Sequence, residues 1–272
     1  LSFFEVSTLM ALLYFADVKP DIVVWEVGLG GSFDATKVAH AKTAVITNVD
    51  LDHTRILGND KETIAKDKCG IITRSACVFS AEEDPVIRAI IMEKAAKQSA
   101  SVCFTGKTDL SLGLPGDHQK KNAALAVAIA KQHGIAQVAI EKGLKKTSWP
   151  GRLQWLEKNV LLDCAHNPAG MRVLGEYLKT LEYERLFVVM GVSRDKDVEE
   201  MVSFLPKYEE LIFTGSPSYR AKPLSEVTVP CKKIAVVKEA LGYVKKRAGE
   251  DDVIVVAGSI FLIGDVLRSY GK

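Results

Sequence analysis

The 272-residue sequence lacks the features that mark membrane proteins, disulfide-stapled proteins and nucleic-acid-binding proteins. No apolar run approaches the roughly 20 residues that span a bilayer. The net charge of +2 is too small to suggest a surface for a polyanion. The five cysteines are odd in number, lie far apart and include no CxxC pair, which favours a reducing compartment. We therefore expect a cytoplasmic protein that binds neither a membrane nor nucleic acid.

What the sequence has in quantity is hydrophobic side chains, 47% of the chain, arranged in alternating strand-like and helix-like stretches. Residues 22–27 and 42–50 are apolar runs of the kind found in strands that are covered on both faces. Residues 3–16, 62–72 and 118–133 have helical spacing, and a glycine follows the last of them. This alternation predicts an α/β protein with a mostly parallel sheet.

The alternation breaks near residues 150–153, where Pro150 and Gly151 interrupt it. Strand-like and helix-like stretches then alternate again to the end of the chain, as in "NVLLDCAHNPAG" and "RLFVVMG". We predict two α/β domains with a hinge at residues 150–153.

A glutamate and a histidine follow the first two predicted strands. Glu26 ends the run at 22–27 and precedes a glycine-rich turn, and His53 comes after the second run together with Asp52. Ligands collect beyond the carboxyl ends of parallel strands, so these side chains could share a divalent cation. Mg²⁺ usually takes only one or two protein ligands. The alternative is a glutamate bonded to backbone amides and a histidine packed in a loop.

Two further loops have some character of a phosphate site. "DCAHNPAG" at 163–170 lies between an apolar strand and a helix, so its backbone N–H groups and His166 could face an anion, although Asn-Pro is also a common turn. "TGKT" at 105–108 fails the phosphate-loop pattern because Ser101 stands where a glycine is required, and we expect a surface turn there.

Six motifs occur in a fixed order along the chain. They are "LSFFEVSTLMALLYFA", "EVGLGGSFDATKV", "DLDHTRILGNDKETIAKDKCGII", "GDHQKKNAALAVAIA", "WPGRLQ" and "LDCAHNPAG". In this order they resemble folylpolyglutamate synthase and dihydrofolate synthase, enzymes of the ATP-dependent Mur ligase superfamily. The resemblance covers essentially the whole chain. It implies an N-terminally truncated, mostly parallel-sheet ATPase-type domain at 1–151, followed by a smaller, Rossmann-like glutamate-ligase domain at 152–272.

The resemblance assigns a metal site to the first domain. Glu26 and His53 match magnesium ligands, and the glycine turn would let phosphate and metal approach the backbone. Lys68, which alone would be taken for a solvated lysine, matches a lysine that can be carbamylated into a metal-binding carboxylate.

It also assigns contacts to ATP and to the second substrate. Asn122 and Arg152, which alone would be taken for surface residues, match contacts to the adenine and to the phosphates. Asp163 matches a contact to the ribose or nucleotide. His166 matches a residue near the phosphate and the incoming glutamate, and Ser259 one that helps to hold the amino acid. Among all these residues, Lys68, Arg152 and His166 are the ones expected to serve catalysis.

The implied reaction is ATP- and Mg²⁺-dependent ligation of L-glutamate to a folate-type carboxylate through an acyl phosphate, by a monomer. The family's phosphate loop and pterin loop lie upstream of the helix with which this sequence opens, so we expect Leu1 to be a truncation point. Two alternatives remain open. The chain could be another Mur-superfamily ligase that acts on a different carboxylate, such as a peptidoglycan precursor, or a non-catalytic remnant that binds a nucleotide.

Overall fold

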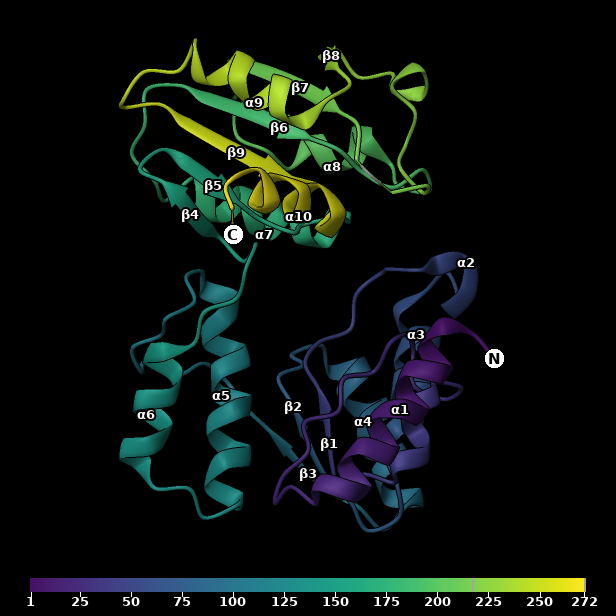
Figure 1. Ribbon diagram of the computed structural model, residues 1–272. Helices are drawn as coiled ribbons and strands as arrows, with labels where there is room; N and C mark the ends of the chain where they lie inside the picture. Colours follow the sequence, from purple (N-terminus) through teal and green to yellow (C-terminus); the bar gives the residue numbers. More distant parts are fainter. Residues whose placement is uncertain (217, 272) are drawn as a thin grey trace. The chain divides into compact units, whose positions relative to one another are not determined.

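The computed structural model describes residues 1–216 and 218–271 and divides the chain into two compact units. Unit 1 comprises Leu1–Leu110 and Lys120–Ile140, and unit 2 comprises Ser111–Gln119 and Glu141–Lys272. Both units are built from helices packed on a sheet (Figure 1), which confirms the predicted α/β class. The domain boundary at residues 151/152 stays a prediction.

Unit 1 is organised on a short parallel sheet in the order β1-β2-β3. Its strands are β1 (Thr43–Ile46), β2 (Cys77–Ser80) and β3 (Ser101–Phe104), and β1 lies in the apolar run predicted at 42–50. Helices α3 (Lys61–Lys68) and α4 (Pro85–Lys97) bury isoleucines and alanines in one core cluster with β1 and β2. Removing this apolar surface from water is the main force that holds the helices on the sheet.

The long helix α5 (Asp117–Gln132) packs on a second, smaller core cluster, where Leu125 lies with Phe79 of β2. It ends as predicted before Gly134, whose φ of +72° is the left-handed conformation that terminates helices. The other helical segments of the first half are α1 (Phe3–Val18), η1 (Ala35–Ala39), α2 (Thr54–Leu57), η2 (Cys69–Ile71) and α6 (Gln137–Lys146). None of the helices in the described residues has the length and apolar character to cross a membrane.

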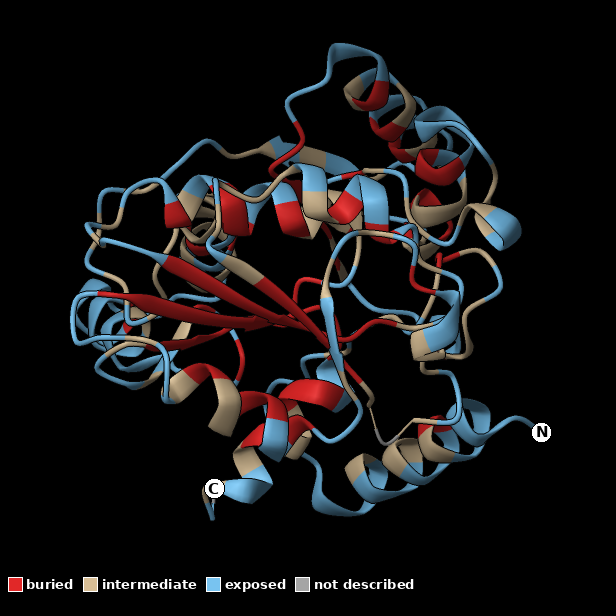
Figure 2. Cartoon of the chain, turned by 90° about the horizontal axis from the view of Figure 1, so that it is seen from above, coloured by how far each residue is buried: buried red, intermediate tan, exposed pale blue. Residues whose placement is uncertain are grey.

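The prediction of a buried strand at residues 22–27 was wrong. The segment forms no strand among the described residues, and Ile22 is 54% and Val24 is 93% exposed. An apolar run becomes a buried strand only when a neighbouring strand pairs with it and other elements cover its faces. Here the sheet of unit 1 has β1 as its edge, and helix α1, near the N-terminus, is itself largely exposed (Figure 2).

Unit 2 contains a six-stranded mixed sheet in the order β4-β5-β9-β6-β7-β8. Every pairing in it is parallel except β4 with β5. The strands are β4 (Gln154–Glu157), β5 (Val160–Leu162), β6 (Leu186–Met190), β7 (Glu210–Thr214), β8 (Lys232–Ile234) and β9 (Val253–Ala257). The helices are α7 (Pro168–Leu178), α8 (Val198–Ser203), η3 (Leu224–Glu226), α9 (Val237–Lys245) and α10 (Ile260–Ser269).

Helices cover both faces of this sheet, as Figure 1 shows for α9 and α10 on one side. Along β6, Val188 and Met190 join the core cluster under α7 and α8, whereas Phe187 and Val189 join the cluster under α9 and α10. Successive side chains of a strand point to opposite faces, so a strand that is buried on both faces must be apolar throughout. Such a sheet places ligand sites beyond the carboxyl ends of its strands.

At the start of β9, a buried carboxylate ties two loops of unit 2 together. The side chain of Asp252 is 2% exposed, accepts from Arg185 Nη2 at 2.7 Å and from the backbone N–H of Gly249 at 2.6 Å. Hydrogen bonds from Arg185 hold the pKa of Asp252 below its ordinary value, although burial opposes this. The pair therefore stabilises the fold above the ordinary aspartate pKa, and the stabilisation is lost as the pH falls through the lower, folded-state value.

We expect Asp252→Asn to lower the free energy of unfolding by about 1–3 kcal/mol near neutral pH, because Arg185 and Gly249 lose a charged acceptor. Thermal unfolding between acidic and neutral pH measures this loss and the smaller pH dependence of the variant. The control is Glu250→Gln, since Glu250 pairs with Lys158 at 3.5 Å between largely exposed side chains and should contribute almost nothing. Equal unfolding temperatures for the two variants would contradict the prediction.

Candidate functional site

The best-defined group of predicted site residues lies where β5 ends in unit 2. Asp163 follows β5 directly and is 9% exposed. One of its carboxylate oxygens accepts the backbone N–H of Leu153 at 2.9 Å and the other accepts that of Ala165 at 2.8 Å. Asp163 thus joins the predicted hinge turn to the loop that follows β5.

The hinge turn is shaped by two residues in the left-handed conformation, Gly151 at φ +70° and Leu153 at φ +46°. A Cβ on Gly151 would lie 2.6 Å from Cys164 Sγ, so only glycine fits this close approach. The carbonyl of Gly151 accepts the N–H of Cys164 at 2.7 Å. Arg152, between the two, is exposed.

The charge of Arg152 reaches the carboxylate that holds the turn. Burial raises the pKa of Asp163 above its ordinary value, while its two backbone hydrogen bonds and the charges of Arg152 and His166 act in the opposite direction. The structure therefore brings Arg152, Asp163 and His166 into one electrostatic group, and their roles in a common site stay a prediction.

His166 is exposed on the loop after β5, with Nδ1 3.0 Å from the carbonyl oxygen of Cys164. In a neutral ring, a proton on Nδ1 donated to that carbonyl leaves Nε2 unprotonated, as an acceptor would require. The next residue, Asn167, caps α7 by accepting the N–H of Gly170 at 2.8 Å. The loop thus presents an imidazole beside the N-terminus of a helix, an arrangement that favours anions.

Ser259 lies at the end of the neighbouring strand, because β9 pairs with β5 in parallel. It is 5% exposed, and its hydroxyl oxygen caps α10 by accepting the N–H of Phe261 at 3.2 Å. The cap explains why a serine stands here, and the hydroxyl can still donate one hydrogen bond.

The predicted metal ligands lie in unit 1 and are exposed. No hydrogen bond or ion pair engages the Glu26 carboxylate among the described residues. The His53 side chain is 46% exposed, with Nε2 3.9 Å from Asp52 Oδ2. The described part of the chain holds no group of three or more candidate metal ligands, so any cation here would rely on few protein donors and on other oxygen ligands.

The glycine turn that follows Glu26 is closely approached by atoms of the protein itself. A Cβ on Gly31 would lie 2.6 Å from the carbonyl oxygen of Lys68, the last residue of α3, and Gly30 has a φ of +66°. Lys68 is half-buried at this contact. Close packing against α3 therefore explains the glycines at these positions, with or without a ligand nearby. Asn122, in the second turn of α5, is exposed.

Asp34 organises the glycine turn and was not predicted. Its carboxylate accepts the N–H groups of Gly28 at 3.0 Å and Leu29 at 2.9 Å, and also bonds the N–H and hydroxyl of Thr36. Burial alone would raise the pKa of Asp34, but these hydrogen bonds outweigh it and leave the pKa below its ordinary value. The available signal was the aspartate two residues before a threonine, a common side-chain-to-backbone turn.

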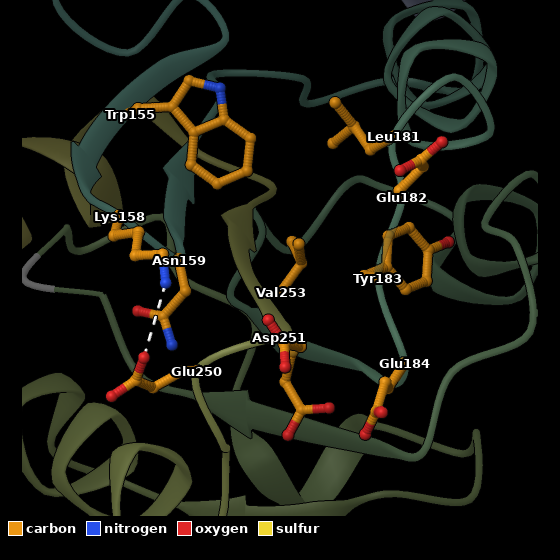
Figure 3. Close-up of a pocket in the computed structure, with 11 residues that line it drawn as sticks. Trp155, Lys158, Asn159, Leu181, Glu182, Tyr183, Glu184, Glu250, Asp251 and Val253 are labelled. Atoms are coloured by element: carbon orange, nitrogen blue, oxygen red, sulfur yellow. Dashed lines mark hydrogen bonds and ion pairs between the residues drawn. The ribbon is translucent and has the colours of Figure 1, made fainter.

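A hollow of about 470 Å³ lies elsewhere in unit 2 (Figure 3). Trp155 and Tyr183 form walls, and Glu184 and Asp251 lie near the starts of β6 and β9. It contains none of the predicted site residues, and those that follow strands of unit 2, Asp163, His166 and Ser259, lie at the opposite, carboxyl ends of β5 and β9.

Comparison with known proteins identifies the class of protein that shares this fold. Residues 151–260 match the family model described as "Mur ligase, glutamate ligase domain". The dihydrofolate synthase/folylpolyglutamate synthase of Bacillus subtilis (strain 168) is 30% identical over 306 residues, covering 97% of this chain and 71% of that protein.

Solved structures agree. The Mycobacterium tuberculosis folylpolyglutamate synthase complexed with ADP and AMPPCP matches with a TM-score of 0.93 and 29% identity, over 100% of this chain and 73% of that one. A bifunctional folylpolyglutamate synthase/dihydrofolate synthase with Mn, AMPPNP and L-glutamate bound matches with a TM-score of 0.88 and 29% identity. The match covers 100% of this chain and 72% of that one. The chain therefore belongs to the folylpolyglutamate synthase/dihydrofolate synthase family of the Mur ligase superfamily.

We expect Asp163→Asn to loosen the hinge turn, because the amide nitrogen that replaces one oxygen cannot accept the N–H of Leu153 or Ala165. The loss of one such buried hydrogen bond should cost about 1–3 kcal/mol. Thermal unfolding gives the cost, and faster hydrogen exchange at those two amides locates it. The control is Asp265→Asn, which removes a surface pair with Arg268 at 3.1 Å. Unchanged exchange at both amides would remove Asp163 from this role.

Proposed function

We propose that the protein is an ATP-dependent acid–amino-acid ligase that adds L-glutamate to a folate-type carboxylate. The observation that carries this proposal is the group of Arg152, Asp163 and His166 at the carboxyl end of β5, in a chain of the folylpolyglutamate synthase/dihydrofolate synthase family. The named relatives bind ADP, AMPPNP, Mn and L-glutamate, which supports the same ligand classes here.

The proposed reaction has two steps. A carboxylate oxygen of the acceptor attacks the γ-phosphorus of ATP, the bond to the bridging oxygen breaks, and ADP leaves an acyl phosphate. The amine of L-glutamate then attacks the acyl carbon, loses a proton and expels phosphate. Both steps depend on positioning and on neutralising negative charge. Arg152 supplies a cation at the phosphates, and Asp163 fixes the turn from which Arg152 extends.

His166 would act in the second step. With Nδ1 held by the Cys164 carbonyl, the ring offers Nε2 to the incoming amine or to the leaving phosphate. Ser259, at the neighbouring strand end, would donate its hydroxyl hydrogen to the amino-acid substrate. Asn122 is proposed as the contact to adenine.

Glu26 and His53 are proposed as ligands of Mg²⁺, and their exposed donor atoms fit a cation that is otherwise coordinated by water and phosphate oxygens. The ion, when bound, would neutralise charge on the transferred phosphoryl group. Carbamylation of Lys68 is a further part of the proposal, which mass spectrometry in bicarbonate buffer tests directly. We also propose a monomer in the cytoplasm, and five free thiols support that compartment.

The test of the function is phosphate release by this 272-residue chain with ATP, Mg²⁺ and L-glutamate, and with dihydropteroate or tetrahydrofolate as acceptor. Release that requires both the acceptor and glutamate supports the ligase. Release only after the chain is joined to a relative's phosphate-loop segment means that this chain carries part of the machinery. A peptidoglycan-type acceptor that works where folates fail, or no release in any form, would overturn the proposal.

We expect Glu26→Gln to abolish Mg²⁺-dependent turnover and to leave the fold intact, because an amide is a much weaker ligand for a hard cation. Mn²⁺ binding followed by electron paramagnetic resonance gives a readout that does not depend on turnover, and thermal unfolding reports on the fold. The matched control is Glu62→Gln, a change on the exposed side of α3. Wild-type Mn²⁺ affinity in Glu26→Gln would take Glu26 out of the metal site.

We expect His166→Ala to slow glutamate ligation by about 10²- to 10⁴-fold, the usual effect of losing a positioned acid or base. Formation of the acyl phosphate should change much less, since Arg152 is intact. Hydroxylamine separates the steps because it traps the acyl phosphate as a hydroxamate without glutamate. The control is His133→Ala, a change of an exposed histidine. An equal loss of hydroxamate formation would place His166 in the first step instead.

A further inference from the structure

One half-buried imidazole in unit 2 has a buried ring nitrogen without a hydrogen-bond partner among the described residues. His118 lies at the start of α5, and its Nδ1 is buried with no hydrogen-bond partner among the described residues. A buried polar atom that is left unpaired costs about 1–3 kcal/mol, so a histidine kept at such a position needs a reason. A hydrophobic side chain of similar size would avoid this cost.

The ring and the side chain of Leu153, a residue of the hinge turn, both lie against Gly116. Gly116, at φ +99°, allows this contact, because a Cβ there would lie 2.7 Å from His118 Cε1 and 2.9 Å from Leu153 Cδ1. His118 and Leu153 therefore close on the same stretch of backbone from two sides. Leu153 is 3% exposed, and its N–H is the one that Asp163 accepts. The imidazole thus lies next to the buried residue that follows Arg152 in the hinge turn.

The charged groups that face His118 are Arg152 from the hinge turn and Asp117 from its own helix. Burial and the positive charge of Arg152 lower the pKa of His118, and Asp117 acts against them with a smaller effect. The ring is consequently neutral near neutral pH. A proton added to it would put a second cation beside Arg152 in a poorly hydrated place, which opposes the packed arrangement.

We propose that His118 is a positioning residue: its neutral ring holds the turn of Gly151, Arg152 and Leu153 so that the guanidinium faces the nucleotide phosphates, and protonation of the ring releases this hold. The proposal rests on the role of Arg152 given above. It makes nucleotide binding sensitive to pH through a residue that does not touch the nucleotide. It also explains the unpaired Nδ1, because a phenyl ring could pack there but could not gain a proton.

The experiment compares the wild-type chain with His118→Gln, which removes the titration, and His118→Phe, which keeps the ring and removes the nitrogens. The first readout is the NMR resonance of the Arg152 Nε–H group, assigned by its loss in Arg152→Lys and followed between about pH 5 and pH 8. We expect it to shift in the wild type with a midpoint below 6.5, the ordinary histidine value. It should stay constant in both variants. His133→Gln, a change of an exposed histidine, should behave as the wild type.

The second readout is affinity for Mg²⁺–AMPPNP. We expect the wild type to bind about tenfold more weakly near pH 5.5 than near pH 7.5, beyond the decrease seen in both His118 variants, a change within the usual range for coupling between two binding events. A wild-type Arg152 resonance that does not follow pH, or one that follows it equally in His118→Gln, overturns the proposal. A resonance that follows His118 in a chain that binds no nucleotide at any pH supports the coupling and overturns the nucleotide role of Arg152. These two failures are therefore distinguishable.

Discussion

The candidate site in unit 2 depends on one buried carboxylate. Asp163 is fixed by the parallel pairing of β5 with β9, and its two oxygens satisfy the backbone N–H groups of Leu153 and Ala165. Buried N–H groups need a partner, so a single side chain here determines the course of two loops at once. The exposed side chains that could take part in chemistry, Arg152 and His166, lie on these loops. Removing Asp163 would therefore disturb both.

The elements that were predicted correctly are those whose burial follows from local pattern. β6 and β9 are short, continuous apolar runs, and both are fully buried between two helical layers. The run at 22–27 has the same character, yet Val24 is 93% exposed while Val188 is fully buried. The difference lies in the neighbours: β6 has β7 and β9 as partners, whereas no described strand pairs with 22–27. Pairing is a property of the fold, and the pattern of one segment does not contain it.

The candidate site was predictable as a set of side chains and much less so as a structure. The motifs identified Arg152, Asp163 and His166, and the fold brings them to one strand end. They did not indicate that Asp163 would accept hydrogen bonds from backbone N–H groups or that Asp34 would organise the glycine turn. These N–H groups are close to the aspartates in sequence, but whether they face the carboxylate depends on how the fold bends the backbone between them. The roles of the eight predicted residues remain predictions. Their positions in the structure show which of them already form hydrogen bonds to other groups of the protein.

Leu153 shows how local strain and function are connected in this turn. A bulky residue at φ +46° is disfavoured by about 1–3 kcal/mol, and it persists only where the surroundings determine it. Here the determinants are its N–H, which the Asp163 carboxylate accepts, and its side chain, which lies against Gly116 beside the ring of His118. The strain is therefore balanced by contacts that include one titratable ring. A turn held in this way has a second arrangement available to it when that ring gains a proton, and the residue that would report the change is Arg152.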